Sequence, residues 1–158
     1  MKLSDIIKEE HIILELKSRD KTGIIKELVD LFKNDNRVKD LPALVQAIEY
    51  RENIMSTGIG KGFAIPHCKS NSVTDIIAAF GRTSEPVDYQ ALDNKPVNLF
   101  FLLACKENLV GPHIKLLSRI SRMMNNEEFR ELLLKAKTIN EIHTIFKKEE
   151  DNYTDLEW

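Results

Sequence analysis

The sequence has few of the features that mark secreted, membrane or nucleic-acid-binding proteins. Its 158 residues include two cysteines, Cys68 and Cys105, and no C-x-x-C pair, so we expect reduced thiols and no disulfide framework. No apolar run approaches the roughly 18–20 residues of a membrane helix, and the charged first ten residues are unlike a secretion signal. The net charge of −2 gives no basic excess for nucleic acid or anionic lipid. We therefore expect a cytoplasmic protein that neither inserts into a membrane nor binds nucleic acid.

The composition is that of a single ordinary globular domain. Hydrophobic residues make up 42% and charged residues 30%, and a chain of this length buries roughly 70% of its unfolded surface. The segments 76–80 and 97–104 are short and continuously apolar, which predicts central strands buried on both faces. Segment 11–15 predicts a third strand. Segment 83–96, with two prolines and an Asp-Asn pair, predicts a surface connection.

Apolar residues at helical spacing predict the other elements. A first short helix is predicted with Ser4 as its N-cap, a second from Lys21 to Asn34, and two more that begin at about Pro42 and at Pro112. Two further helices are predicted to begin where Asn125 precedes Glu128 and where Thr138 precedes Glu141, because these pairs have the spacing of a capping box. The inward stripe of the helix at Pro112 is predicted to be Ile114, Leu117, Ile120 and Met124. Strands alternating with helices predict a single-domain α/β layered sandwich, a mixed β-sheet flanked by helices on both faces.

The stretch Ser56-Thr-Gly-Ile-Gly-Lys-Gly-Phe-Ala-Ile-Pro-His67 is the most unusual local pattern. Its three glycines would let the backbone approach a phosphate closely. The pattern is neither G-x-G-x-x-G nor a P-loop, and an extended segment follows where both nucleotide motifs need a helix. A nucleotide site is therefore disfavoured. The alternative is a tight turn leading into a strand that ends at an ordinary histidine.

His67 is the first candidate for chemistry, because neutral imidazole can act as a base, a ligand or a nucleophile. A zinc site is disfavoured, since the four histidines at 11, 67, 113 and 143 are scattered. Cys68 would point away from its neighbour on an extended segment. We expect no metal and no cofactor.

Arg51 and His113 are candidates with two interpretations each. Arg51 continues the apolar stripe of Leu44 and Ile48, where it could cap the helix C-terminus or bind an anion. His113 follows Pro112 in the first turn of a helix and shares a face with apolar residues. It could be a core histidine or could hold an anion at the helix N-terminus.

Three blocks of the chain resemble one known family. The stretch Arg51-Glu-Asn-Ile-Met-Ser-Thr-Gly-Ile-Gly-Lys-Gly-Phe-Ala-Ile-Pro-His67-Cys, with segments 91–101 and 113–130, is similar to the fructose/mannitol/nitrogen-regulatory (type 2) enzyme IIA of the bacterial phosphoenolpyruvate-dependent sugar phosphotransferase system. The resemblance covers residues 3–147. The charged residues 148–158 are expected to form a separable, frayed tail. Phe63 and Cys68 depart from the family, which more often has a smaller aliphatic residue and a glycine there.

The resemblance implies a phosphotransferase that works through a phosphohistidine. His67 would take a phosphoryl group on Nε2 from phosphorylated HPr and pass it to a cysteine of an enzyme IIB, which serves the membrane enzyme IIC. Arg51 would stabilise the phosphoryl oxygens and His113 would position them, while the glycines would permit close approach. The fructose-type branch is the nearer in appearance. The alternative is a nitrogen-type regulator that binds proteins according to its phosphorylation state.

Overall fold

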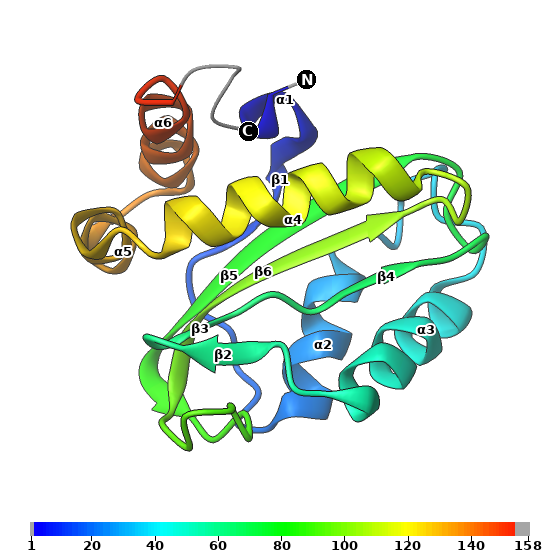
Figure 1. Cartoon of the computed structure of the whole chain (residues 1–158), viewed down its shortest axis with the longest axis horizontal. Helices are drawn as coiled ribbons and strands as arrows, with labels where there is room; N and C mark the ends of the chain where they lie inside the picture. The colour runs from blue at the N-terminus through cyan, green and yellow to red at the C-terminus, as the bar shows by residue number, and fades with distance from the viewer. Residues whose placement is uncertain (1, 154–158) are drawn as a thin grey trace.

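The computed structural model describes residues 2–153. Its elements are, in order, α1 (Leu3–Ile6), β1 (Ile7–Ile13), α2 (Lys21–Asp30), α3 (Leu41–Ile54), β2 (Gly58–Gly60), β3 (Phe63–Ala64), β4 (His67–Lys69), β5 (Ile76–Val87), β6 (Val97–Cys105), α4 (Val110–Met124), α5 (Glu127–Lys135) and α6 (Ile139–Glu150). The strands form one mixed sheet in the order β1-β5-β6-β3-β2, with β4 also paired to β6. Helices cover both faces (Figure 1), which confirms the predicted α/β sandwich.

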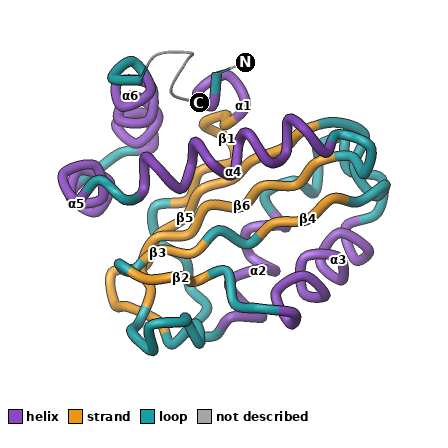
Figure 2. The backbone as a smooth tube through the Cα atoms, viewed as in Figure 1, coloured by secondary structure: helices purple, strands orange, loops and turns teal. Residues whose placement is uncertain are grey.

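The two continuous apolar segments form the antiparallel centre of the sheet, as predicted. Along β6 the side chains alternate between the two faces. Phe101 and Leu103 pack in the cluster that includes α4, α5 and α6, whereas Phe100 and Leu102 pack with α2 and α3. The strand therefore separates two cores, which is why its sequence is apolar at every position but one. Figure 2 shows the strands side by side between the helices.

Two strands extend beyond their predicted limits. Strand β1 starts at Ile7, four residues before the predicted strand, because Ile7 already pairs with Ala78 of β5. It ends at Ile13, so the prediction of a strand at residues 14 and 15 is wrong. Strand β5 runs to Val87, which pairs with Val97, so the prediction of a surface connection over 83–96 is wrong for its first five residues. Pro86 is tolerated there because the ladder to β6 shifts register between Arg82 and Val87.

Strands β3 and β4 lie one after the other along the same edge of β6. Phe63 of β3 pairs with Leu99, and His67 of β4 pairs with Leu103, both in parallel. Pro66 lies between the two strands and has no N–H to donate, while its carbonyl accepts a bond of 3.1 Å from the Leu103 amide. His67 is therefore the first residue of a strand that pairs with β6 alone among the described strands.

Aspartate caps start the two helices on one face of the sheet. The Asp20 carboxylate accepts from the Gly23 amide at 2.8 Å, and the Asp40 carboxylate accepts from the Ala43 amide at 3.0 Å. Helix α3 therefore begins one residue before Pro42, which leaves the proline in the first turn. Helix α2 ends at Asp30 and continues as turns through residue 34, so the predicted helix was four residues too long.

The cap of α1 comes from the other end of the chain. The amides of Leu3 and Ser4 both donate to the carboxylate of Glu150, the second at 2.9 Å. The prediction of Ser4 as N-cap is therefore wrong, because a carboxylate distant in sequence satisfies the amides that a local hydroxyl would have bound.

The helix predicted at Pro112 begins two residues earlier, at Val110. Ile120 and Met124 are buried as predicted, but Ile114 is 62% exposed, so its assignment to the inward stripe is wrong. Leu116 takes the buried place instead, one turn after His113. Asn125 ends α4, and the cap of α5 is therefore Asn126, whose side chain accepts from the Glu128 amide at 3.1 Å.

Helix α6 starts as predicted, with the Thr138 hydroxyl accepting from the Glu141 amide at 3.1 Å. It continues to Glu150, so residues 148–150 of the predicted tail are helical, and Glu149 and Glu150 are buried. The predicted tail residues 154–158 lie outside the described residues. Within residues 2–153 no helix has both the length and the apolar character needed to span a bilayer.

Candidate functional site

The position of His67 follows from the register of β4. Because it pairs with Leu103, its side chain points to the α4 side of the sheet. Its Nδ1 lies 2.6 Å from the carbonyl oxygen of Ile65, two residues earlier. A carbonyl oxygen only accepts, so Nδ1 carries the proton and Nε2 of the neutral ring keeps its lone pair.

His113 lies opposite His67, in the first turn of α4. The two ring centroids are 5.5 Å apart with the planes tilted by 47°. His113 is 4% exposed, and its Nδ1 has no hydrogen-bond partner within residues 2–153. A buried nitrogen without a partner is costly, which marks this ring as a group that still has hydrogen-bonding capacity.

Both rings are held neutral. Burial lowers the pKa of His113 to about 4, with smaller contributions from His67 and Lys69. Burial also lowers the pKa of His67, and the positive charge of Arg51 acts in the same direction. The Ile65 hydrogen bond and the Glu52 carboxylate oppose this shift. At neutral pH the site therefore offers His67 Nε2 as an unprotonated nucleophile.

Arg51 comes to the same place from the last turn of α3. Its Nη1 donates to the carbonyl oxygen of Met55 at 2.9 Å, just beyond the helix end. This is the capping bond of the first interpretation. The bond to Met55 uses one of the five N–H donors of the guanidinium. Arg51 also lines a surface depression whose lining includes His67 and His113.

The depression has a volume of about 400 Å³ and is open to solvent. Its lining comes from α3, β4 and α4: Ala47, Tyr50, Arg51, Ile54, His67, Cys68, Lys69, His113 and Leu117. The structure thus brings together the three predicted site residues from three separate elements. It also adds Lys69, which the sequence interpretation missed. The signal was the two-residue period of a strand, which places residues 67 and 69 on the same side.

Exposed apolar side chains lie in the depression and next to its lining residues in sequence. Tyr50 is 74% exposed and Ile54 is 67% exposed at the end of α3, and Met55 follows at 54%. Val110 and Ile114, on either side of His113 in the first turn of α4, are 45% and 62% exposed. We call these five residues the apolar rim. Large apolar side chains gathered at a polar site are typical of a surface that meets another protein.

The glycine-rich loop does not reach this site. Gly60, Lys61 and Gly62 have positive φ angles and form the tip of the β2–β3 hairpin, and Lys61 Nζ donates to Asn125 Oδ1 at 3.2 Å. Asn125 ends α4, about 18 Å along the helix axis from His113 at 1.5 Å per residue. The tight turn of the alternative interpretation is therefore present, although His67 begins strand β4 instead of ending a strand. The expectation that the glycines approach the site is wrong.

Neither thiol belongs to the reacting groups. Cys68 packs with the α2 and α3 core while Cys105 packs in the α4 core, so the sheet separates them. Burial raises the pKa of both thiols to about 12, which keeps them protonated and weakly nucleophilic. Within residues 2–153 no group of three or more His, Cys, Asp or Glu side chains is arranged to hold a metal ion.

Comparison with known proteins identifies the family of the chain. Residues 5–149 match the family model described as phosphoenolpyruvate-dependent sugar phosphotransferase system, EIIA 2. The chain is 37% identical over 148 residues to the PTS system fructose-specific EIIABC component of Bacillus subtilis, covering 94% of this chain and 23% of that protein. It is also 37% identical over 136 residues to the PTS system fructose-specific EIIA component of Haloferax volcanii, covering 86% of this chain and 88% of that protein.

A solved structure has the same fold. The crystal structure of nitrogen regulatory protein IIA-Ntr from Neisseria meningitidis superposes with a TM-score of 0.85 at 31% identity, covering 91% of this chain and 98% of that one. The match therefore extends to fructose-specific and nitrogen-regulatory relatives alike. On this evidence the chain belongs to the EIIA 2 family of the phosphoenolpyruvate-dependent sugar phosphotransferase system.

Proposed function

We propose that this chain is a phosphocarrier of the sugar phosphotransferase system, acting in the cytoplasm. His67 accepts a phosphoryl group on Nε2 from the phosphohistidine of HPr and passes it to a cysteine of an enzyme IIB, which in turn serves the membrane enzyme IIC. The observation that carries the proposal is the bond from His67 Nδ1 to the Ile65 carbonyl, since it fixes Nε2 as the available nucleophile. The identity to two fructose-specific proteins favours fructose-type uptake.

Neither phosphoryl transfer needs a nucleotide. In the first, the Nε2 lone pair of His67 attacks the phosphorus, the P–N bond of the donor breaks, and its electron pair returns to the donor imidazole. In the second, the thiolate of the enzyme IIB cysteine attacks the same phosphorus, and the electron pair returns to Nε2. While the phosphoryl group is on Nε2, the ring is cationic, and the Ile65 carbonyl stabilises the remaining Nδ1–H.

The neighbours of His67 supply what phosphoryl transfer needs, which is positioning and charge stabilisation. His113 is neutral, so one of its ring nitrogens can donate to a phosphoryl oxygen. Arg51 has unused guanidinium donors beside the same depression, and Lys69 adds a second positive charge. A cationic pair with a positioning imidazole suits the transferring phosphoryl group better than it suits a metal ion.

The apolar rim supports a relay between two proteins. A carrier has to meet its donor and its acceptor in turn, and each has to bring its own reacting atom to Nε2. Tyr50 and Ile54 offer a large exposed apolar area directly beside Arg51. Such a surface can be shared by successive partners.

A regulatory role is the second candidate. It is favoured by one observation, the close superposition on the nitrogen regulatory protein of Neisseria meningitidis. In this role the same His67 chemistry would control the binding of other proteins according to the phosphorylation state. The two roles differ in the acceptor, so the test has to include one.

The experiment is an intact-mass measurement after incubation with phosphoenolpyruvate, enzyme I and HPr. We expect a gain of about 80 Da, the mass of one phosphoryl group, that is labile in acid and absent from His67→Ala. A folded wild-type chain that gains no mass would refute the relay. Adding a fructose-type enzyme IIB should then discharge the phosphorylated chain within seconds, whereas a stable phosphorylated chain would favour the regulatory candidate.

A further inference from the structure

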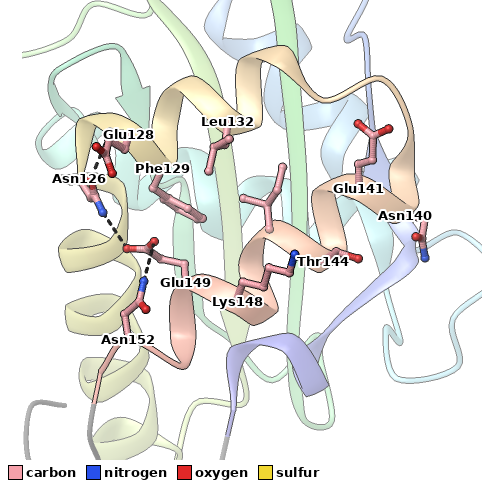
Figure 3. A pocket seen from close by; sticks show the side chains of 11 residues that line it. Asn126, Glu128, Phe129, Leu132, Asn140, Glu141, Thr144, Lys148, Glu149 and Asn152 are labelled. Carbon is pink, nitrogen blue, oxygen red and sulfur yellow. Dashed lines mark hydrogen bonds between the residues drawn. The ribbon is translucent and has the colours of Figure 1, made fainter.

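A second cleft lies between α5 and α6 (Figure 3), and neither His67 nor His113 lines it. It has a volume of about 640 Å³. One wall carries apolar side chains: Phe129 forms the buried floor, Ile145 is partly buried, and Leu132 stands at the mouth with 52% of its surface exposed. A leucine that is half exposed beside a cavity of this size leaves apolar area that a ligand could cover.

Glu149 forms the polar part of the cleft. It is only 8% exposed, and its carboxylate accepts from Asn126 Nδ2 at 2.9 Å, from the Tyr153 hydroxyl at 3.1 Å and from Asn152 Nδ2 at 3.4 Å. All three donors are neutral. No salt bridge joins Glu149 to a lysine or arginine within residues 2–153. The carboxylate is thus positioned by hydrogen bonds, but its charge has no cationic partner there.

The charge around the cleft has one predominant sign. Glu128 and Glu141 line it together with Glu149, and the lining contains one basic residue, Lys148. In Figure 3 the Lys148 side chain extends toward Thr144 rather than toward Glu149. Three carboxylates and one ammonium around an apolar floor attract a cation that carries an aliphatic stem.

We propose that the α5–α6 cleft docks a basic amphipathic segment of a partner protein. An arginine or lysine stem packs on Leu132 and Ile145, and its charged head reaches Oε2 of Glu149. Within residues 2–153 this oxygen accepts only the longer 3.4 Å bond from Asn152, so it retains accepting capacity toward the ligand. An acidic segment would meet like charge at this cleft and is excluded from it.

The cleft is independent of the proposed relay. It begins at Asn126, just past the end of α4, whereas His113 is in the first turn of that helix, about 18–20 Å away by helix rise. A phosphoryl group on His67 would act across about two Debye lengths at physiological salt. A partner could therefore stay bound at α5 and α6 while donor and acceptor exchange at the apolar rim.

The test uses a defined probe with the full-length chain. The probe is a fluorescein-labelled 14-residue peptide with leucine on one helical face and arginine on the other, and the control peptide has glutamate in place of arginine. Fluorescence anisotropy should show binding of the arginine peptide alone. The side-chain amide signals of Asn126 and Asn152 should shift in nuclear magnetic resonance spectra, with affinity changed less than twofold by phosphorylation of His67.

Matched variants separate docking from general charge attraction. Glu149→Gln should weaken peptide binding at least tenfold, whereas Glu131→Gln, an equal charge change on α5 outside the cleft lining, should change it less than twofold. Because Glu149 is buried, Leu132→Ser at the cleft mouth provides a second test, with the exposed Leu134→Ser as its control. Equal weakening within either pair, binding of the glutamate peptide, or no binding of the arginine peptide would overturn the proposal.

Discussion

The Nδ1 atom of His67 lies 2.6 Å from the carbonyl oxygen of Ile65, so the imidazole is held in one tautomer and one orientation. We predict that nitrogen-15 shifts of His67 at neutral pH report a protonated Nδ1 and an unprotonated Nε2. After phosphorylation, the phosphorus should couple to Nε2. Coupling to Nδ1 would contradict the assignment, because it would require the Ile65 bond to break.

Replacement of His113 by alanine should slow the loading of His67 by about a hundredfold, the order of the effect of removing one charge-stabilising donor. The measurement is single-turnover transfer from phosphorylated HPr, followed by quenching and intact mass. His143→Ala is the control, since His143 bonds to the Ser4 carbonyl, remote from the site. An unchanged transfer rate in His113→Ala would mean that His113 is a core histidine with no part in phosphoryl transfer.

Arg51→Lys should reduce the transfer rate by about tenfold or more while the chain stays folded. Lysine keeps the charge but loses the planar set of donors, and a hydrogen bond to a charged group contributes about 1.5–3 kcal/mol. Rapid-quench kinetics at saturating HPr measure the effect. Wild-type rates would mean that the bond to Met55 is the whole role of Arg51.

The apolar rim should act on partner binding rather than on chemistry. Tyr50→Ser is expected to raise the HPr concentration for half-maximal rate by about tenfold, since loss of buried aromatic area costs about 1–2 kcal/mol. The maximal rate should change less than threefold. Leu134→Ser, an exposed leucine on α5, should leave both values unchanged, and an equal effect of the two substitutions would argue against docking at the rim.

The fold should lose stability as the pH falls from 7.5 to 5.5. The pKa of His113 is about 4 in the folded chain, against the ordinary 6.5 of a histidine in the unfolded chain. In this pH window the unfolded chain therefore binds a proton that the folded chain does not. The loss from this residue is about 1 kcal/mol. His67 and His11, whose pKa values burial also lowers, contribute in the same direction.

Urea unfolding at the two pH values measures this loss. In His113→Gln, which cannot titrate, the difference between the two free energies of unfolding should shrink by about 1 kcal/mol. Glu131→Gln, on the exposed side of α5, should leave the difference as in the wild type. A His113→Gln chain with the full pH dependence would show that the ring already titrates normally when folded.

The sequence predicts the parts of this molecule whose signals are local. Strand β6 is apolar because both of its faces are buried. Thr138 begins α6 through a hydrogen bond from the amide of Glu141, only three residues later in the sequence. The three site residues also carry local oddities, such as an arginine on an apolar stripe. Their meeting in one depression could not be derived from spacing, because it depends on the register of β4 against β6 and on the packing of α3 and α4 beside it.

The errors arose where a long-range interaction replaced a local one. Ser4 has the chemistry of an N-cap, yet Glu150 takes that role. Pro86 suggests a break, yet a register shift lets β5 continue. The glycines suggested a phosphate cradle because they let the backbone take positive φ angles and approach another group closely. In the structure these angles serve the turn of the β2–β3 hairpin.

The carboxylate of Glu150 is separated from Leu3 by 147 residues of chain. During synthesis, the first helix is therefore made long before the residue that caps it. A ribosome-bound chain that has emerged only to α5 has the strands of its sheet but cannot yet hold α1 in place. Completion of this fold therefore waits until α6 has left the ribosome, and a nascent chain that stops at α5 leaves the amides of Leu3 and Ser4 without their cap.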